Sequence, residues 1–317
     1  MAEAAPTMTQ HPARGAQHSF AVQVPATSAN LGPGFDALGM ALGLSNTVYV
    51  EPSAELSIEV VGEGAGELAP GPENLVYRAL ARVAERLGTR PPPVRLRCEN
   101  GIPLARGLGS SSAAIVAGLL VGNRLHGDAL NVPQLLDLAV EIEGHPDNVT
   151  PALLGGVRVC VAGERGPVQA VVRLERPLQA VLFVPDFPLS TAAARALLPA
   201  SLPLGDAVYN LGRAALLVAA LTSGDYALLR EATRDRLHQP ARSALFPAMP
   251  AFFAAALQAG ALGAFLSGAG PTLLALVEVA AAADAVAAAF ATTAQETGVA
   301  GRSLVVAAAT NGARVLA

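Results

Sequence analysis

Residues 102–114 read I-P-L-A-R-G-L-G-S-S-S-A-A, a glycine- and serine-rich stretch that runs directly into an apolar segment. Alternating apolar and polar residues at 94–98 predict a strand before it, and an apolar stripe from Ala113 to Val121 predicts a helix after it. Glycines let the backbone approach a ligand closely, and serines at a helix start supply caps and oxygen ligands. The pattern favours a phosphate site built from backbone N–H groups. Taken alone, it fits a turn that merely caps a buried helix equally well.

The charged residues narrow the chemistry of this loop. All 21 basic residues are arginines, so the chain contains no lysine. A Walker-type loop places a lysine on the β- and γ-phosphates, and that motif is therefore excluded. The net charge of −4, scattered arginines, 4% aromatic residues and absence of tryptophan give no surface for nucleic acid. The sequence predicts no nucleic-acid partner.

The composition is apolar but does not predict a membrane protein. Hydrophobic residues make up 52% and charged residues 15% of the chain, yet much of the excess is alanine. No run reaches the roughly 18 continuous apolar residues that a spanning helix requires. Residues 1–18 are polar, lack the apolar core of a secretory signal, and are expected to be disordered. Cys98 and Cys160 lie in apolar segments and are expected to be free thiols in a reducing cytoplasm. We expect a soluble cytoplasmic protein with no membrane partner.

Strand-like and helix-like segments predict an α+β protein in two halves, with a boundary between residues 163 and 178. The expected division is a tail at 1–18, one domain at 19–170 and a second at 171–317. Predicted strands cover 20–24, 47–51, 56–60, 94–98, 155–161, 168–174, 180–185, 263–266, 272–279 and 303–308. Predicted helices cover 74–87, 110–126, 133–143, 191–198, 205–223, 225–237, 250–259 and 280–297.

Polar, turn-rich segments interrupt these apolar elements. Residues 25–36 offer Asn30 and Asp36 on a glycine-shaped loop, and residues 141–148 gather three acids, a histidine and an asparagine. The second group has the chemistry to bind a divalent cation or orient a substrate, although a solvated helix end with a proline turn has the same composition. Thr191 and Arg195 share one helix face, and Arg195 with Arg242 would suit bidentate capture of a carboxylate or phosphate. Each arginine could equally be a surface cation.

Four segments of the chain together carry a resemblance to a known family. In order they are P-A-T-S-A-N-L-G-P-G-F-D at 25–36, P-L-A-R-G-L-G-S-S-S-A-A at 103–114, E-G-H-P-D-N-V at 143–149 and S-G-A-G-P-T at 267–272. The set resembles the GHMP small-molecule kinase superfamily, and the match runs from Val22 to Thr272. G-L-G-S-S alone indicates only the superfamily. The 30–36 loop, the 145–148 run and H-Q-P-A-R at 238–242 resemble the homoserine kinases within it.

The resemblance implies a two-domain GHMP kinase fold with an N-terminal ribosomal-protein-S5-domain-2-like half and a C-terminal ferredoxin-like half. It implies phosphorylation of the L-homoserine side-chain hydroxyl by ATP with Mg²⁺, a step of threonine biosynthesis. Another GHMP kinase and a catalytically inactive sensor of ATP or an amino acid are the alternatives. The missing lysine and the paired arginines disfavour the first, and the intact serines and acids disfavour the second. A homodimer is compatible with the sequence, which does not determine the oligomeric state.

The resemblance also implies roles for individual residues. The ATP phosphates would lie against Pro103, Leu104, Ala105, Arg106, Gly107, Leu108, Gly109, Ser110, Ser111, Ser112 and Ala113. Mg²⁺ would be held by Ser111, with Ser110 as alternative, and by Glu143, with Glu141 as alternative. Homoserine would contact Asn30, Asp36, His145, Asn148, Thr191, Arg195, Arg242, Gly268 and Gly270. The catalytic roles would fall to Asn148 and Arg195.

Two positions bear on the activity that the resemblance implies. Asn148 stands where mevalonate kinases have a catalytic aspartate, and an amide cannot act as a general base at neutral pH. We therefore expect the hydroxyl proton to pass to the γ-phosphate, directly or through water. Ala241 stands where the resemblance leads us to expect an aromatic ring, which would loosen the wall beside Arg242.

Overall fold

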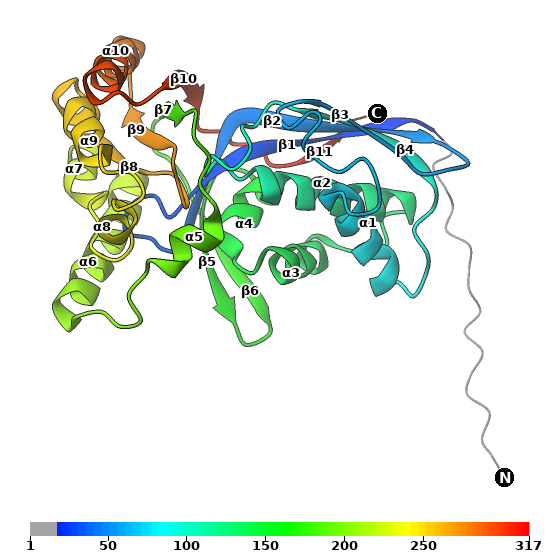
Figure 1. Ribbon diagram of the computed structural model, residues 1–317. Coiled ribbons are helices and arrows are strands. Elements are labelled where there is room, and N and C mark those ends of the chain that lie inside the picture. Colours follow the sequence, from blue (N-terminus) through cyan, green and yellow to red (C-terminus); the bar gives the residue numbers. More distant parts are fainter. Residues whose placement is uncertain (1–17, 317) are drawn as a thin grey trace.

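The structure is a computed structural model that describes residues 18–316, and these residues form two β-sheets that both carry helices (Figure 1). The α+β arrangement agrees with the prediction from the sequence. The tail predicted at residues 1–18 lies outside the described residues except for His18.

The first sheet has seven strands, in the order β11-β1-β2-β4-β3, with β5 paired to β2 and β6 paired to β5. Its strands are β1 (Phe20–Ala29), β2 (Leu38–Pro52), β3 (Ser57–Gly62), β4 (Val94–Asn100), β5 (Val157–Gly163), β6 (Gly166–Val172) and β11 (Arg314–Leu316). The helices of this half are α1 (Leu75–Arg86), α2 (Ser110–Leu125), α3 (Val132–Glu143) and α4 (Pro146–Leu154). They lie together on one face of the sheet, and the β5–β6 hairpin projects beyond them (Figure 1).

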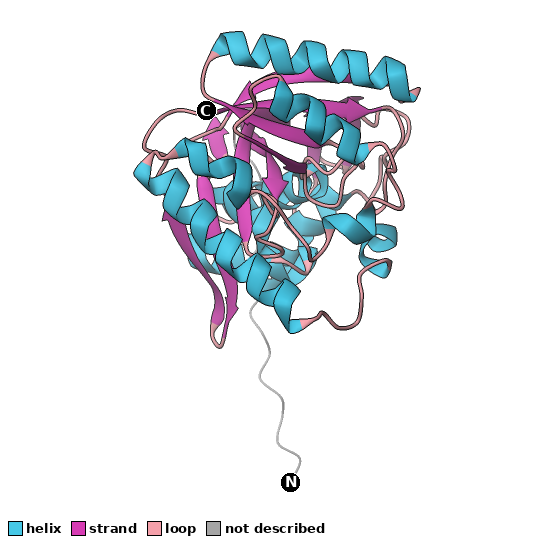
Figure 2. Ribbon diagram, turned by 90° about the vertical axis from the view of Figure 1, so that its left-hand side faces the viewer, coloured by secondary structure: helices cyan, strands magenta, loops and turns pink. Residues whose placement is uncertain are grey.

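The second sheet has four antiparallel strands in the order β10-β7-β9-β8. They are β7 (Gln179–Pro185), β8 (Gly263–Leu266), β9 (Leu273–Val277) and β10 (Gly301–Ala307). Its helices are α5 (Thr191–Ala196), α6 (Leu204–Ser223), α7 (Leu229–Ala232), α8 (Gln239–Arg242), α9 (Met249–Gln258) and α10 (Ala280–Thr297), with a 3₁₀ turn η1 (Tyr226–Leu228). Figure 2 views the molecule from this side and shows long helices lying across the strands.

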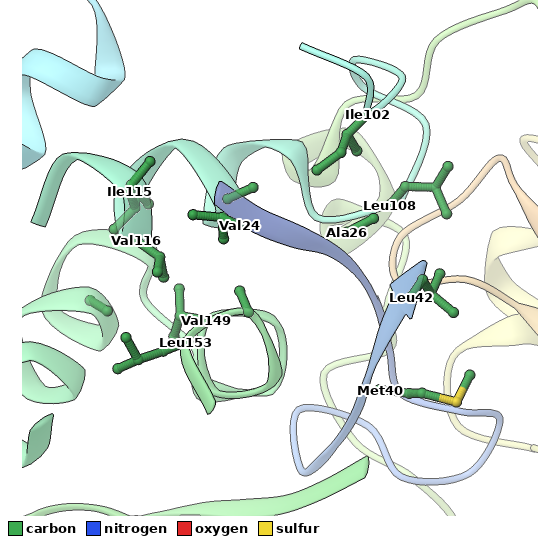
Figure 3. Close-up of a cluster of buried hydrophobic side chains, with 14 of the residues drawn as sticks. Val24, Ala26, Met40, Leu42, Ile102, Leu108, Ile115, Val116, Val149 and Leu153 are labelled. Atoms are coloured by element: carbon green, nitrogen blue, oxygen red, sulfur yellow. The ribbon is translucent and has the colours of Figure 1, made fainter. Parts of the chain in front are cut away.

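Helix α2 is the central helix of the first half, and its position fixes the loop that precedes it. Ile115 and Val116 of α2 pack into the same buried cluster as Val24 and Leu42 of the sheet (Figure 3). Leu108, at the end of the loop, is buried in this cluster as well. Full burial of one such side chain stabilises the fold by about 1.5–3 kcal/mol. The start of α2 is therefore held firmly against the sheet.

The two halves share part of their hydrophobic core, and the last strand of the chain pairs with the first sheet. The hydrophobic cluster of the first half continues into the second sheet through Leu182 and Phe265. After β10 the chain returns to the first sheet, where β11 pairs with β1 at Val22 and Val315. We propose that the chain forms two domains, residues 19–170 and 171–317. Strand β11 belongs to the second segment of the chain but pairs within the first sheet.

Several element predictions differ from the structure. A single helix over 225–237 is wrong, because the helical turns of η1 and α7 end at Ala232. The Asp235 carboxylate accepts hydrogen bonds from the backbone of Leu237, His238 and Gln239, which offers these amides an alternative to a helix. Helix α4 was missed because Pro146 and Pro151 suggest a turn, although proline is well suited to the first helical position.

Helix α6 is long and apolar enough to cross a membrane, judged by length and composition alone. One of its faces is buried through Leu217 and Leu221, whereas Leu204, Val208 and Leu211 on the opposite face are exposed. The helix thus packs on the second half along one side.

Candidate active site

Two glycines in the left-handed region shape the loop between β4 and α2, Gly107 at φ +74° and Gly109 at φ +69°. A Cβ added at Gly109 would lie 1.9 Å from Thr27 Oγ1, and one at Gly107 would lie 2.3 Å from the carbonyl oxygen of Ser267. The backbone N–H of Thr27 donates to the Leu108 carbonyl at 3.0 Å, and Ser267 Oγ donates to the Gly107 carbonyl at 2.7 Å. Only glycine fits these two positions, and the loop is clamped between both halves of the molecule.

Arg106 fastens the same loop to the second sheet. Its Nε donates to the Pro185 carbonyl at 2.8 Å, Nη2 to the Asp186 carbonyl at 2.5 Å, and Nη1 to the Leu104 carbonyl at 2.9 Å. The guanidinium is thus engaged by backbone oxygens at the end of β7. Its side chain therefore holds the loop to the end of β7.

A cavity of about 360 Å³ opens beside the loop, between the two halves. Residues 105–111 line it on the loop side. The sequence-predicted substrate contacts that line it are Asn30, Asp36, His145, Asn148, Thr191, Arg195, Arg242 and Gly268. The predicted residues outside its lining are Pro103, Leu104, Ser112, Ala113 and Gly270. Side chains from segments more than 200 residues apart therefore meet in one place.

Glu143 joins the end of α3 to the start of α2. Its carboxylate accepts hydrogen bonds from Ser112 Oγ at 2.7 Å and from Ser111 Oγ at 3.1 Å. Glu141 lies elsewhere, 3.4 Å from Arg82 on α1. One carboxylate and two serine hydroxyls thus lie together at the start of α2, beside the cavity.

His145 and Asp147 form a polar pair on the cavity wall. His145 Nδ1 lies 2.7 Å from Asp147 Oδ1, and the Asp147 side chain is 2% exposed. Burial opposes the protonation of His145, but the hydrogen bond to Asp147 and the charges of Asp147 and Glu143 outweigh it and raise the pKa of His145. Asn148, beside this pair, accepts a hydrogen bond from Thr27 Oγ1 at 2.8 Å through its Oδ1.

The loop at 30–36 brings a carboxylate to an arginine of the other half. Asn30 Nδ2 donates to the Gly268 carbonyl at 2.9 Å, and its Oδ1 accepts from the backbone N–H of Asp36 at 3.1 Å. Arg195 of α5 then forms a two-point ion pair with Asp36, with N–O distances of 2.6 and 3.0 Å. Both side chains of this pair are about one-third exposed. Asn30 thus shapes the loop, while the Asp36–Arg195 pair faces the cavity.

Arg242 is the most deeply buried cation of the cavity wall, with 3% of its surface exposed. Its Nη1 donates to the Gly268 carbonyl at 2.9 Å and to His238 Nδ1 at 3.0 Å. His238 Nε2 lies 2.8 Å from the Gly32 carbonyl, which can only accept, so the proton of this neutral ring is on Nε2. Burial, and after it the nearby Arg195, lower the pKa of Arg242 to about 10, which keeps it cationic at neutral pH.

The Phe35 ring lies close to both arginines of the wall. The guanidinium carbons of Arg195 and Arg242 are 5.4 and 5.5 Å from its centroid. An aromatic ring was expected at position 241, where the chain has alanine. Phe35, in the 30–36 loop, places a ring beside Arg242.

A second cavity of about 520 Å³ adjoins the first and shares Leu75, Ala105, Ser110, Ser111 and Thr191 with it. Its remaining wall is largely apolar and includes Val60, Leu68, Val76 and Leu104. The shared loop residues therefore separate a polar chamber from an apolar one.

Comparison with known proteins identifies the family of the chain. The GHMP kinases N terminal domain matches residues 74–156, and the GHMP kinases C terminal domain matches residues 217–295. The chain is 49% identical over 256 residues to the homoserine kinase of Desulfitobacterium hafniense, covering 81% of this chain and 86% of that one. It is 46% identical to the homoserine kinase of Trichormus variabilis, covering 89% and 93%.

The crystal structure of homoserine kinase from Cytophaga hutchinsonii matches with a TM-score of 0.86 at 31% identity, covering 95% of this chain and 98% of that one. The chain belongs to the homoserine kinase family. The predicted two-domain GHMP kinase fold is thereby confirmed. The mevalonate kinase of L. major, with a TM-score of 0.72 at 16% identity, shares the fold alone.

Some residues of this homoserine kinase site were missed from the sequence. Asp147 lies within the 141–148 run, but a role was predicted only for its neighbours His145 and Asn148. His238 opens H-Q-P-A-R, of which only Arg242 was assigned a role. Arg78, which also lines the cavity, sits in an ordinary amphipathic helix pattern and gives no signal in the sequence.

Proposed function

We propose that the chain transfers the γ-phosphoryl group of ATP to the side-chain hydroxyl of L-homoserine, giving O-phospho-L-homoserine and ADP. The observation that carries this proposal is the convergence of a backbone-built phosphate loop with Asp36, Arg195 and Arg242 in one cavity. A zwitterionic amino acid needs one anion for its ammonium group and cations for its carboxylate, and this cavity offers both.

ATP would occupy both chambers. The apolar cavity beside Leu75 and Val76 suits a nucleobase, and residues 105–111 would surround the phosphates. The first N–H groups of α2 have no partner within the helix and favour negative charge at this end. The bound nucleotide would thus extend along the loop, with its base in the apolar chamber and its phosphates in the polar one.

The residues near Glu143 fit a magnesium ion that arrives with ATP. Mg²⁺ is usually held by one or two carboxylates together with substrate phosphates and waters. Glu143 and Ser111 would hold it, and Glu143 is favoured over Glu141 because it already contacts the serine hydroxyls. The ion would neutralise charge on the transferring phosphoryl group.

Homoserine would exchange with the Asp36–Arg195 ion pair. Its ammonium group would take the place of the Arg195 guanidinium on Asp36, and its carboxylate would satisfy Arg195 and the buried Arg242. The exchange replaces the Asp36–Arg195 pair with one ion pair at each end of the substrate, so an amino acid can enter without leaving Asp36 or Arg195 alone. A substrate with only one of the two charges cannot complete this exchange.

The hydroxyl proton has no free carboxylate to receive it in the described cavity wall. Asp36 is paired with Arg195, Glu143 with two serines, and Asp147 with His145. Asn148 is an amide and already accepts from Thr27. Transfer of the proton to the γ-phosphate, directly or through water, is therefore the simplest route, and Asn148 and Arg195 would act by positioning.

The test is turnover by the purified protein with ATP, Mg²⁺ and L-homoserine, with the phosphorylated product identified by ³¹P NMR. Mevalonate and galactose serve as competing substrates. We expect product from homoserine alone. Turnover of mevalonate or galactose instead would indicate another GHMP kinase, and ATP binding without any turnover would indicate a sensor.

A further inference from the structure

Four arginines line the cavity, and three of them are already engaged by the protein. Arg106 donates to three backbone carbonyls, Arg195 is paired with Asp36, and Arg242 bonds to His238 and Gly268. Arg106 supports the loop, and Arg195 and Arg242 are assigned to the homoserine carboxylate, so none of the three is left for a phosphate chain. Apart from the magnesium ion proposed above, the wall cation left to meet the phosphate charge is therefore the fourth arginine, because the loop itself offers only neutral donors.

The fourth arginine, Arg78, differs from the other three. It lies in the first turns of α1, is exposed, and lines the cavity together with Ser111 and Glu143. Within residues 18–316 its guanidinium makes no ion pair or side-chain hydrogen bond, whereas Arg82, one turn later, pairs with both Glu85 and Glu141. Arg78 has therefore kept its full donor capacity at the edge of the phosphate chamber.

We propose that the Arg78 guanidinium binds the ATP phosphates and supplies the cation that a lysine supplies in a Walker-type loop. This inference rests on the proposed function, since it concerns the nucleotide of that same site. A planar guanidinium can donate two parallel hydrogen bonds to a phosphate, and such charge-assisted bonds are about twice as strong as neutral ones. Arg78 and Glu143 line the same chamber without pairing, which leaves Glu143 for the metal ion and Arg78 for the phosphate oxygens.

The experiment compares binding of Mg-ATP and of AMP by calorimetry, without homoserine. Arg78→Ala should weaken Mg-ATP binding by about 10- to 100-fold, the loss typical of a charge-assisted contact, and leave AMP binding within about threefold. Arg78→Lys should recover part of the loss. Arg86→Ala is the matched control, because Arg86 is an exposed arginine of the same helix outside the cavity wall, and it should change neither affinity.

An unchanged Mg-ATP affinity in Arg78→Ala overturns the proposal, and so does an equal loss for AMP, which would place Arg78 at the nucleoside. Arg78→Gln, which keeps most of the side chain, serves as a second variant if the alanine variant does not fold. Since the titrations contain no homoserine, a lack of homoserine turnover in the unaltered protein would contradict the proposed function and leave this test of Arg78 intact.

Discussion

The phosphate end and the amino-acid end of the cavity are built in opposite ways. The phosphate end consists of one continuous loop, residues 105–111, followed by the start of α2 and joined by Glu143. The amino-acid end is assembled from segments around Asp36, His145, Arg195, Arg242 and Gly268, which come from both halves of the molecule. The first end depends on local backbone shape, whereas the second depends on the correct docking of two sheets.

The two ends also differ in their electrostatics. At the phosphate end most of the donors are backbone N–H groups and serine hydroxyls, which carry no net charge. Arg242 is almost fully buried and keeps its charge, and removal of a buried charge or of its partner is among the most damaging single changes. We therefore expect the largest effects at the amino-acid end.

The largest expected effect is that of Arg242→Leu. Loss of the carboxylate contact should lower kcat/KM for homoserine by about 100-fold or more, while KM for ATP stays within about threefold. Steady-state kinetics with each substrate varied in turn measures both. Arg236→Leu is the control, because Arg236 lies in the same segment but pairs with Asp206 at the surface. An equal loss in kcat/KM for ATP would mean that Arg242 also contributes to the phosphate end of the cavity.

Gly109→Ala should act at the other end of the cavity. The added Cβ would collide with Thr27 and occupy a left-handed conformation, so we expect a loss of about 1–3 kcal/mol in the free energy of unfolding and a raised KM for ATP. Urea unfolding and ATP kinetics measure the two effects. The control is Gly212→Ala within α6, where a Cβ meets open space and should stabilise by up to about 1 kcal/mol. A Gly109→Ala variant with unaltered stability and ATP kinetics would contradict the clamped loop.

Asn148→Asp probes the place where the two ends meet. A new carboxylate beside Asp147 and Glu143 would repel the phosphates, and we expect kcat/KM for ATP to fall about tenfold, since like charges at close range typically cost about 1–2 kcal/mol. Asn148→Ala separates the loss of the amide from the added charge. A rate increase of orders of magnitude in Asn148→Asp would show that the hydroxyl does need a carboxylate base at this position.

The smallest effect concerns the pH dependence of His145. Its pKa is raised in the folded protein, so its contribution to stability is complete below the pKa of an unfolded histidine and is lost as the pH rises through the folded value. The unaltered protein should exceed His145→Gln in stability by more at pH 5.5 than at pH 9, by up to about 1 kcal/mol. Urea unfolding of both proteins across this range measures the difference. The opposite trend would mean that burial lowers the pKa of His145 by more than the contact with Asp147 raises it.

The same contrast explains what the sequence predicts and what it does not. The phosphate loop is predictable because Gly107, Gly109 and the serines are adjacent in the chain and lead into an apolar helix. The amino-acid end has no local pattern, and Asp36, Arg195 and Arg242 could be placed together only through the family resemblance. Their internal bonds, Asp36 with Arg195 and His238 with Arg242, follow from docking of the two halves and leave no trace in residue spacing.

The limits of local reasoning are also visible in the secondary structure. The long helix expected over 225–237 fails because the buried Asp235 side chain captures backbone amides, an interaction that helical propensity does not include. The final strand β11 was missed because a short, exposed segment is a strand only by virtue of its pairing with β1. In each case the deciding partner lies outside the local sequence window.

The most direct test of a cavity built for a zwitterion compares homoserine with two analogues that each lack one charge, using the unaltered protein. These are 4-hydroxybutanoate, without the ammonium group, and 3-aminopropan-1-ol, without the carboxylate. Phosphorylation of homoserine is expected, with kcat/KM for each analogue lower by about 100-fold or more, because neither analogue can satisfy both the carboxylate and the arginines of the cavity. Phosphorylation of either analogue at a rate within about threefold of homoserine, or no phosphorylation of homoserine, would contradict a cavity built for a zwitterion.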